Sequence, residues 1–236
     1  GSTSGIGLGI ARAFAAAGAS VVLNGLGKPE DIVETQARLV SEFGVRVNYS
    51  PADMSKASAI EEMIDKTLES FGRLDVLVNN AGIQHVSAVE DFPVERWDAV
   101  IAINLSSAFH TTRLALPAMR QAKWGRIINI ASAHGLVASA NKSAYVAAKH
   151  GIVGLTKVTA LETATTGVTC NAICPGWVLT PLVQKQVDAR AAAQGLSQDE
   201  AKRQLVGEKS PSQQFTTPEQ LGALAAFLCS EAAINV

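Results

Sequence analysis

The sequence predicts an α/β fold with a doubly wound parallel sheet, and two observations support this prediction. Apolar runs about as long as a strand alternate with longer helical patterns along nearly the whole chain, which is typical of strand–helix–strand units on a parallel sheet. The chain also opens in a glycine-rich turn that leads directly into a helical pattern. No repeat, low-complexity segment or linker interrupts the alternation, so we predict one domain over residues 1–236.

The expected elements follow one another in order along the chain. Strands are expected at residues 20–24, 45–50, 74–79, 125–131 and 168–173. Helices are expected at residues 6–17, 30–43, 57–71, 94–121, 143–163 and 218–230. Four helical patterns stop at a glycine, the residue that most readily adopts the left-handed backbone that ends a helix. These glycines are Gly18, Gly44, Gly72 and Gly167. Residues 181–218 form a polar helical pattern that is not tied to a strand, and we interpret them as a helical lid over the site.

Both ends of the sequence suggest that strands are missing. The opening glycine turn normally follows a strand, and a further strand is expected after the helix at 218–230. We therefore expect this sequence to lack the first and last strands of the sheet and to be a fragment of a longer chain. Since the first strand of a doubly wound sheet lies in its middle, its absence would leave a gap in the core.

Composition excludes several classes of partner. The 20 basic and 21 acidic side chains give a net charge of −1, and no basic run offers a surface for nucleic acid or an anionic membrane. No apolar stretch approaches the roughly 18 residues of a membrane span. Three cysteines are too few for a disulfide framework and fit a reducing, cytoplasmic compartment. Cys170 and Cys174 have no second pair nearby, so we interpret them as buried small apolar residues and predict no metal site.

The segment 1–7, Gly-Ser-Thr-Ser-Gly-Ile-Gly, has the composition of a pyrophosphate-binding turn. Glycines let the backbone approach the phosphates closely, and the unpaired N–H groups and dipole of the following helix stabilise their charge. Glycines also serve tight turns and close helix packing, so the turn alone is a weak signal.

A second motif, Asn79-Asn80-Ala81-Gly82, ends an apolar strand. Two adjacent asparagines are unusual in a buried position unless their amides have dedicated partners. The motif is either an ordinary turn or a wall beside the sugar and nicotinamide of a cofactor.

The residues with the clearest chemical meaning are Tyr145 and Lys149, which are four apart on a predicted helix and so share one face. An ammonium group beside a phenol favours the phenolate, and this would bring the pKa of Tyr145 down toward the working range of a general acid/base. Ser132, at the carboxyl end of its strand, can hydrogen-bond a substrate oxygen. A Tyr-x-x-x-Lys pair alone is more often a solvated helix face.

These motifs, with Asn104, Ser132, Tyr145 and Lys149 as a set, resemble the short-chain dehydrogenase/reductase family over essentially the whole chain. The resemblance implies a Rossmann-type fold and hydride transfer with a nicotinamide cofactor. It implies that Asn104 anchors a water relay, Ser132 positions the substrate oxygen and Tyr145 exchanges its proton. It also implies that Lys149 lowers the Tyr pKa and holds the nicotinamide ribose.

The resemblance further implies where the cofactor binds and how the chain assembles. Thr180, in the Pro-Gly segment 175–181, would bind the carboxamide, and Asp53 with Met54 would contact the adenine. The full implied cofactor set is Gly1, Thr3, Gly5, Ile6, Leu26, Asp53, Met54, Asn80, Tyr145, Lys149 and Thr180. A homotetramer is implied, paired through the helices 94–121 and 143–163 and a C-terminal strand.

The residues around the catalytic set favour a small carboxylate as the substrate. Side chains rich in hydrogen-bond donors, with one apolar wall, are expected to surround it. These are Gln84, His134, Lys142, Trp177 and Gln186, in addition to Ser132 and Tyr145. Each has an ordinary alternative as a loop or surface residue. Segments 80–85, 131–142 and 174–177 resemble family members that oxidise (R)-3-hydroxybutyrate to acetoacetate, which implies a small 3-hydroxy acid as the substrate.

The choice of cofactor is NAD, although the usual acidic residue is missing. Sites selective for NAD often place an acid at the end of the second strand, where this chain has Asn-Gly-Leu-Gly-Lys at 24–28. Lys28 can in principle meet a 2′-phosphate, but Ser4 is not the basic residue that NADP-using relatives commonly carry. The resemblance to NAD-using members decides for NAD. The alternatives are a reductase of another carbonyl, such as a 3-oxoacyl thioester, and a cofactor-binding protein without turnover.

Overall fold

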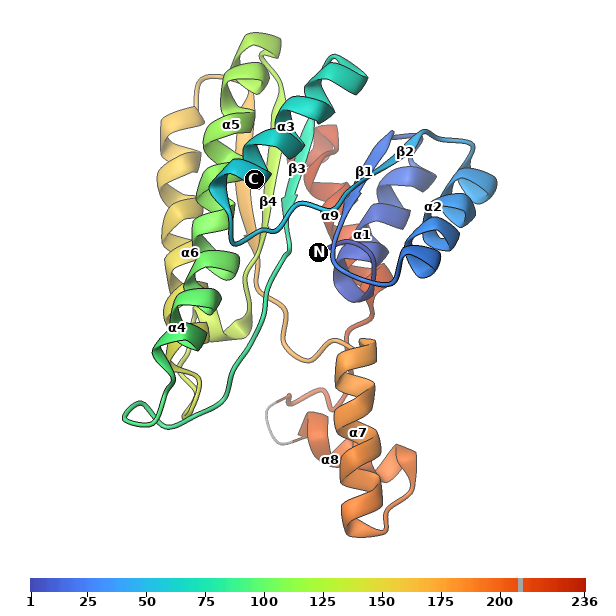
Figure 1. Cartoon of the computed structure of the whole chain (residues 1–236), viewed down its shortest axis with the longest axis vertical. Coiled ribbons are helices and arrows are strands. Elements are labelled where there is room, and N and C mark those ends of the chain that lie inside the picture. The colour runs from blue at the N-terminus through green and yellow to red at the C-terminus, as the bar shows by residue number, and fades with distance from the viewer. Residues whose placement is uncertain (208–209) are drawn as a thin grey trace.

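Five short strands form two parallel sheets in the computed structural model, which describes residues 1–207 and 210–236 (Figure 1). One sheet pairs β1 (Val21–Asn24) with β2 (Val47–Ser50). The other has the order β3 (Val76–Asn79), β4 (Gly125–Ile130) and β5 (Val168–Ile173). All pairs are parallel, so the α/β Rossmann-like class predicted from the sequence is confirmed.

Four of the five strands described end where the sequence predicts, but three begin later. β1, β2 and β3 start one or two residues after the expected positions 20, 45 and 74, and β4 ends at Ile130 rather than 131. Among the described residues, β1 and β3 form no strand pairing with each other, so the two parallel sheets are separate.

Helices connect the strands and cover both sheets. They are α1 (Gly5–Ala16), α2 (Pro29–Phe43), α3 (Ala57–Phe71), α4 (Val94–Ile101), α5 (Ser107–Ala122), α6 (Ser143–Thr163), α7 (Pro181–Gln194), α8 (Gln198–Gly207) and α9 (Pro218–Leu228). The glycine stops after α1, α2 and α3 are confirmed, because Gly44 and Gly72 cap their helices with φ of 67° and 72° and Gly18 follows the cap of α1 with φ of 84°. Gly167 also has positive φ, but α6 already ends at Thr163.

The expectation of one continuous helix over 94–121 is wrong. A five-residue π-helical segment, Ala102–Ser106, separates α4 from α5. A π turn carries one extra residue per turn and occurs mostly as a short bulge inside an α-helix, often at a functional site. The residue pattern that predicts helix does not distinguish the two hydrogen-bonding schemes.

α1 and α9 pack against each other through glycines. A Cβ atom on Gly9 would lie 2.6 Å from the backbone of Pro218, and one on Gly222 would lie 2.7 Å from the carbonyl oxygen of Gly9. Beneath this contact, Ile10 of α1 and Leu221 of α9 share one apolar cluster with Ile128 of the three-stranded sheet. The two helices therefore link the N-terminal part of the fold to the second sheet.

The predicted lid contains α7 and α8, which project away from the sheets in Figure 1. They have an apolar cluster of their own, with Val187, Ala191, Ala201 and Leu205 buried and Trp177, Val183 and Phe215 packed against them. An isolated bridge between Val178 and Thr216 joins the two chain segments at the base of this unit. Residues 208 and 209 of the predicted lid lie outside the described residues. No helix in the described parts of the chain has the length and apolarity needed to cross a bilayer.

Candidate active site

Tyr145 and Lys149 lie on α6, one turn apart, as the sequence predicts. The Lys149 ammonium nitrogen lies 5.6 Å from the centroid of the Tyr145 ring and donates a 2.7 Å hydrogen bond to the carbonyl oxygen of Ile130 at the end of β4. Lys149 is 4% exposed. The end of β4 and the first turns of α6 thus hold the pair together.

Burial controls the acid–base properties of both groups. It lowers the pKa of Lys149 to about 8, an effect that the nearby Cys174 partly opposes. It raises the pKa of Tyr145, and the hydrogen bond between Tyr145 and the Ser132 side chain only partly offsets this. The expected net lowering of the Tyr145 pKa by Lys149 is therefore not found, because the cost of burying a phenolate outweighs the stabilising contacts.

Ser132 and His134 reach Tyr145 from the short 3₁₀ turn that follows β4. The Ser132 hydroxyl oxygen accepts a 3.1 Å hydrogen bond from the backbone N–H of His134, which caps the turn Ala133–Gly135. The His134 and Tyr145 rings meet edge to face with centroids 6.1 Å apart. Three side chains of the predicted site are therefore brought together around the phenol.

Asn104 lies within the π-helical segment and is 1% exposed. Its amide oxygen accepts from the N–H of Ile83 at 2.8 Å, and its amide nitrogen donates to the carbonyl oxygen of Ile83 at 3.0 Å. Both hydrogen-bonding groups of this side chain are thus used to hold the backbone just after the Asn-Asn-Ala-Gly motif.

The paired asparagines have the dedicated partners that their position demands. Asn80 donates to the carbonyl oxygen of Gly1, which ties the motif to the glycine turn. Asn79 donates to the amide oxygen of Asn129 at 2.8 Å and accepts from the hydroxyl of Thr111 at 2.6 Å. Asn129 in turn donates to the hydroxyl of Thr156 on α6 at 2.8 Å.

This buried polar chain contains residues that the sequence analysis missed. Asn129 is 1% exposed and lies inside the strand Ile-Ile-Asn-Ile, where a lone amide among apolar residues was the available signal. These hydrogen-bonded side chains connect β3, β4, α5 and α6. They therefore fix the helix that carries Tyr145 to the strand that carries Asn79.

The glycine turn suits a pyrophosphate. Gly5 begins α1 with φ of 55°, and no side chain caps the first turn of this helix, so its N–H groups face outward with the positive end of the dipole. Thr180 lies against this turn, since a Cβ on Gly5 would be 3.4 Å from the Thr180 methyl. Thr3 lies so close to Gly25 that a Cβ there would be 2.5 Å from the Thr3 hydroxyl.

The residues predicted to contact the adenine lie on the same side of the fold. Leu26 follows β1 and is 80% exposed. Asp53 follows β2, where one oxygen accepts from the backbone and hydroxyl of Ser55 at 2.9 and 2.7 Å and so holds the pKa of this carboxyl below its usual value. Met54 is half-buried beside it. These residues would hold the adenine end of a nicotinamide dinucleotide whose pyrophosphate binds at the glycine turn.

The five residues predicted to surround the substrate are only partly assembled. His134 contacts Tyr145, whereas Trp177 packs edge to face on Phe215, 6.4 Å between centroids, within the α7–α8 unit. Gln84 and Gln186 are exposed, on the loop after β3 and on α7. These two glutamines therefore lie on separate segments of the described chain, one after β3 and one in α7.

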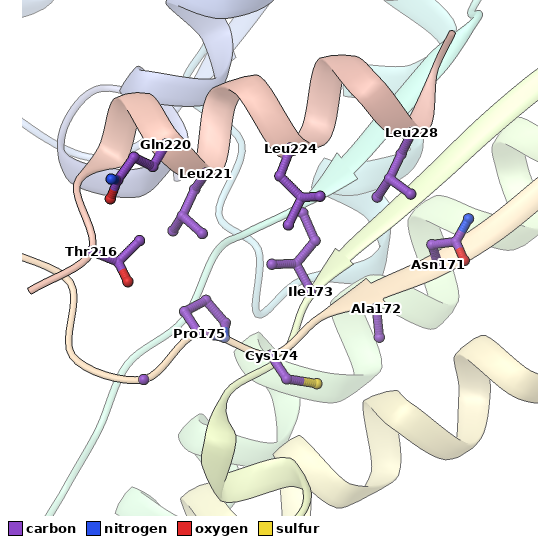
Figure 2. Close-up of a pocket in the computed structure, with 11 residues that line it drawn as sticks. Asn171, Ala172, Ile173, Cys174, Pro175, Thr216, Gln220, Leu221, Leu224 and Leu228 are labelled. Carbon is purple, nitrogen blue, oxygen red and sulfur yellow. The ribbon is translucent and has the colours of Figure 1, made fainter. Parts of the chain in front are cut away.

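A distinct hollow lies along β5 and α9 (Figure 2). Apolar side chains from the two elements line it, including Ile173, Leu221 and Leu224, with Pro175 and Thr216 at one end. None of the predicted catalytic or substrate residues lines this hollow. Within residues 1–207 and 210–236, no three His, Cys, Asp or Glu side chains gather as metal ligands would.

The parallel strands, the glycine turn and the Ser132–Tyr145–Lys149 cluster together define a Rossmann-like oxidoreductase. Residues 1–191 match the family described as short chain dehydrogenase, and the chain belongs to this family.

Similar proteins agree with this assignment. The chain is 68% identical over 236 residues to D-beta-hydroxybutyrate dehydrogenase of Cupriavidus necator, covering 100% of this chain and 91% of that one. It is 53% identical over the same length to the protein of that name in Rhizobium meliloti, covering 92% of it. L-sorbose reductase from Gluconobacter frateurii, solved with NADPH and L-sorbose, is 30% identical with a TM-score of 0.94, over 100% of this chain and 89% of that one.

Proposed function

We propose that this chain catalyses the reversible oxidation of (R)-3-hydroxybutyrate to acetoacetate with NAD. The observation that carries the proposal is the 68% identity, over the whole chain, to a D-beta-hydroxybutyrate dehydrogenase. The cluster of Ser132, Tyr145 and Lys149 supports it, because it combines a proton carrier, a hydrogen-bond donor and a cation at one place.

In this proposal Tyr145 accepts the hydroxyl proton of the substrate, and Ser132 holds the substrate oxygen beside it. Since burial raises the pKa of Tyr145, the protonated phenol is the resident form and is ready to donate during reduction of acetoacetate. Oxidation requires the phenolate, which the ammonium of Lys149 favours. Asn104 fixes the backbone at Ile83 and anchors the water relay that returns the proton to solvent.

The cofactor proposal assigns the pyrophosphate to the glycine turn. When bound, NAD accepts the hydride. The residues assigned to it are Gly1, Thr3, Gly5, Ile6, Leu26, Asp53, Met54, Asn80, Tyr145, Lys149 and Thr180. NAD is preferred to NADP because no basic side chain precedes the second glycine of the turn, where Ser4 stands. The side-chain amide of Asn24 donates to the carbonyl oxygens of Ser50 and Ala52, so this side chain links the ends of β1 and β2 and we assign it no contact with the ribose.

The substrate proposal assigns the carboxylate to Lys142, with Gln84, His134 and Gln186 as further donors and Trp177 as the apolar wall. Gln186 and Trp177 belong to the α7–α8 unit and its base, so residues 181–218 act as a lid that brings them to the substrate. Cytoplasmic location and a homotetramer paired through α4–α5 and α6 complete the proposal.

The decisive test is steady-state oxidation of (R)-3-hydroxybutyrate by the purified protein, compared with the (S) isomer and with NADP in place of NAD. Turnover with the (R) isomer and NAD, and little with either substitute, is the expected result. A folded protein that binds NAD but does not turn over this substrate would refute the substrate assignment and leave the family assignment intact.

A reductase of 3-oxoacyl thioesters is the second candidate, since a monensin polyketide synthase putative ketoacyl reductase from Streptomyces virginiae is 38% identical over 238 residues. The two candidates differ in whether the substrate has a free carboxylate. Lys142→Ala should raise KM for 3-hydroxybutyrate by about 10-fold or more, the effect of losing a charged partner. An unchanged KM would remove Lys142 from the carboxylate site and favour the thioester.

A further inference from the structure

The backbone before Lys142 has an unusual conformation. Asn141 has φ of 63°, in the left-handed region that side-chain-bearing residues seldom occupy. Asparagine adopts this region more readily than most residues, and the exposed side chain of Asn141 makes no hydrogen bond with the rest of the described chain. The requirement at this position is therefore conformational.

This conformation turns the chain so that it can meet the loop at residues 83–92. The carbonyl oxygen of Asn141 accepts a 3.0 Å hydrogen bond from the N–H of Ser87, and Ser87 and Lys142 form an isolated parallel bridge. The carbonyl oxygen of Lys142 accepts from the N–H of Val146 at 2.8 Å, in the first turn of α6. Lys142 is thus fixed to the helix on one side and to the loop on the other.

The 83–92 loop is itself anchored at both ends. Asn104 holds Ile83 through two hydrogen bonds. At the other end, Phe92 packs against the buried cluster of Val100, Ala144 and Ala148, to which Tyr145 also contributes. The hydrogen bond between Ser87 and Asn141 is therefore a third attachment of this loop. It lies between the attachments at Ile83 and Phe92, and the same loop carries Gln84.

We propose that Asn141 is a positioning residue for the substrate site: its left-handed backbone clips the 83–92 loop to the start of α6, and this clip sets Lys142 and Gln84 on facing segments for the substrate carboxylate. The inference rests on the proposed function. Without the clip, Lys142 would keep its place in sequence before α6 but lose its fixed position relative to the loop.

The test compares substitutions that differ in their tolerance of positive φ. Asn141→Gly retains the left-handed backbone, whereas Asn141→Val strongly disfavours it, and Asn141→Ala is a milder version of the same change. We expect Asn141→Val to raise KM for (R)-3-hydroxybutyrate by about 10-fold, with kcat and the Kd for NAD within about 3-fold of the unmodified protein. Asn141→Gly should keep KM within about 2-fold.

The chain offers a matched control in Lys123, which ends α5 with φ of 53°. Lys123→Val imposes the same kind of backbone strain away from Tyr145 and the loop. It should lower thermal stability without changing KM. If Asn141→Val does not fold, Asn141→Ala is compared with Asn141→Gly, and equal KM values for the two would overturn the proposal.

Hydrogen exchange of peptides from residues 83–92, measured by mass spectrometry, separates this proposal from the proposed function. Faster exchange in Asn141→Val than in Asn141→Gly would show that the clip exists, even if the unmodified protein does not oxidise 3-hydroxybutyrate. Faster exchange with an unchanged KM would show that the clip does not position the substrate residues, and would refute the inference.

Discussion

The proposed role of Lys149 requires a positive charge, but burial at its position disfavours that charge. Its ammonium group is nearly enclosed and donates a hydrogen bond to the carbonyl oxygen of Ile130. Burial lowers its pKa to about 8, so the charge that favours a Tyr145 phenolate is partly lost above that pH. The two residues therefore make opposite demands on pH during oxidation, since the phenol must lose a proton while the amine keeps one.

The lowered Lys149 pKa predicts a measurable pH dependence of stability. Between pH 8 and the usual lysine value of 10.5, the unfolded chain binds more protons at this residue than the folded chain does. The contribution of Lys149 to the free energy of unfolding should therefore rise with pH in this window, by at most about 1.4 kcal/mol per pH unit.

Urea unfolding of the unmodified protein and of Lys149→Met at pH 7.5, 8.5 and 9.5 measures this contribution. The difference in unfolding free energy between the two proteins should move in favour of the unmodified protein as pH rises. A difference that stays constant from pH 7.5 to 9.5 would contradict a lowered Lys149 pKa.

The spacing of Tyr145 and Lys149 in the sequence correctly predicts a shared helix face, but the predicted direction of the Tyr145 pKa is wrong. Spacing along a helix determines which side chains are neighbours. It does not determine how deeply β4 and the 3₁₀ turn cover them, and that depth decides the pKa here. The positive φ of Asn141 was missed for a similar reason, because a polar residue in a loop has many possible conformations.

At the scale of elements, the contact between α1 and α9 depends on the absence of side chains. Gly9 and Gly222 bring the two helices so close that a Cβ on Gly222 would lie 2.7 Å from the backbone of α1. The glycine turn that is proposed to bind the pyrophosphate begins α1, so this packing also supports the cofactor site.

Gly222→Ala should destabilise the protein by about 1–3 kcal/mol, because the helices must move apart to admit the methyl group. Gly154→Ala is the matched control: Gly154 lies in α6 with open space around it, and alanine there should be neutral or stabilise by about 0.5–1 kcal/mol. Thermal and urea unfolding of the two variants give the comparison. Equal unfolding free energies would show that the close approach of α1 and α9 does not limit stability.

Most of the secondary structure was predictable from the sequence because its signals are local. Glycine stops and apolar runs placed α2, α3, α6 and β5 to within one residue. The π-helical segment could not be predicted, because an extra residue in a turn leaves no mark in a short apolar pattern.

At the scale of the whole molecule, the α7–α8 unit and the sheet region each have an apolar cluster of their own. The cluster around Val187 lies within that unit, whereas the cluster around Ile128 lies between the three-stranded sheet and α1 and α9. Gln184 adds polar links within the unit, donating to Asp188 and to Gln198. The unit therefore has an apolar core and polar contacts of its own.

Val187→Ala tests this separation, because Val187 is 0% exposed within the α7–α8 cluster. Hydrogen exchange in α7 and α8 should speed up by roughly 10-fold or more, as expected for a small cavity in a local core, while exchange in β4 and α6 stays unchanged. Val33→Ala, at an exposed position of α2, is the control and should leave all of these regions unchanged. A uniform rise in exchange across the molecule would show that the two clusters unfold together.

The π-helical segment at 102–106 has a consequence for how the chain tolerates insertions and deletions. Removing one residue from it would restore a regular α-helix, and each residue of such a helix advances its direction by about 100°. Because five residues of a π-helical segment cover about the same rotation as four residues of an α-helix, α4 and α5 would keep nearly the same relative direction. The side chains within the segment would shift instead, and Asn104 would no longer face Ile83. The catalytic arrangement therefore depends on the number of residues in this turn as well as on which residues they are.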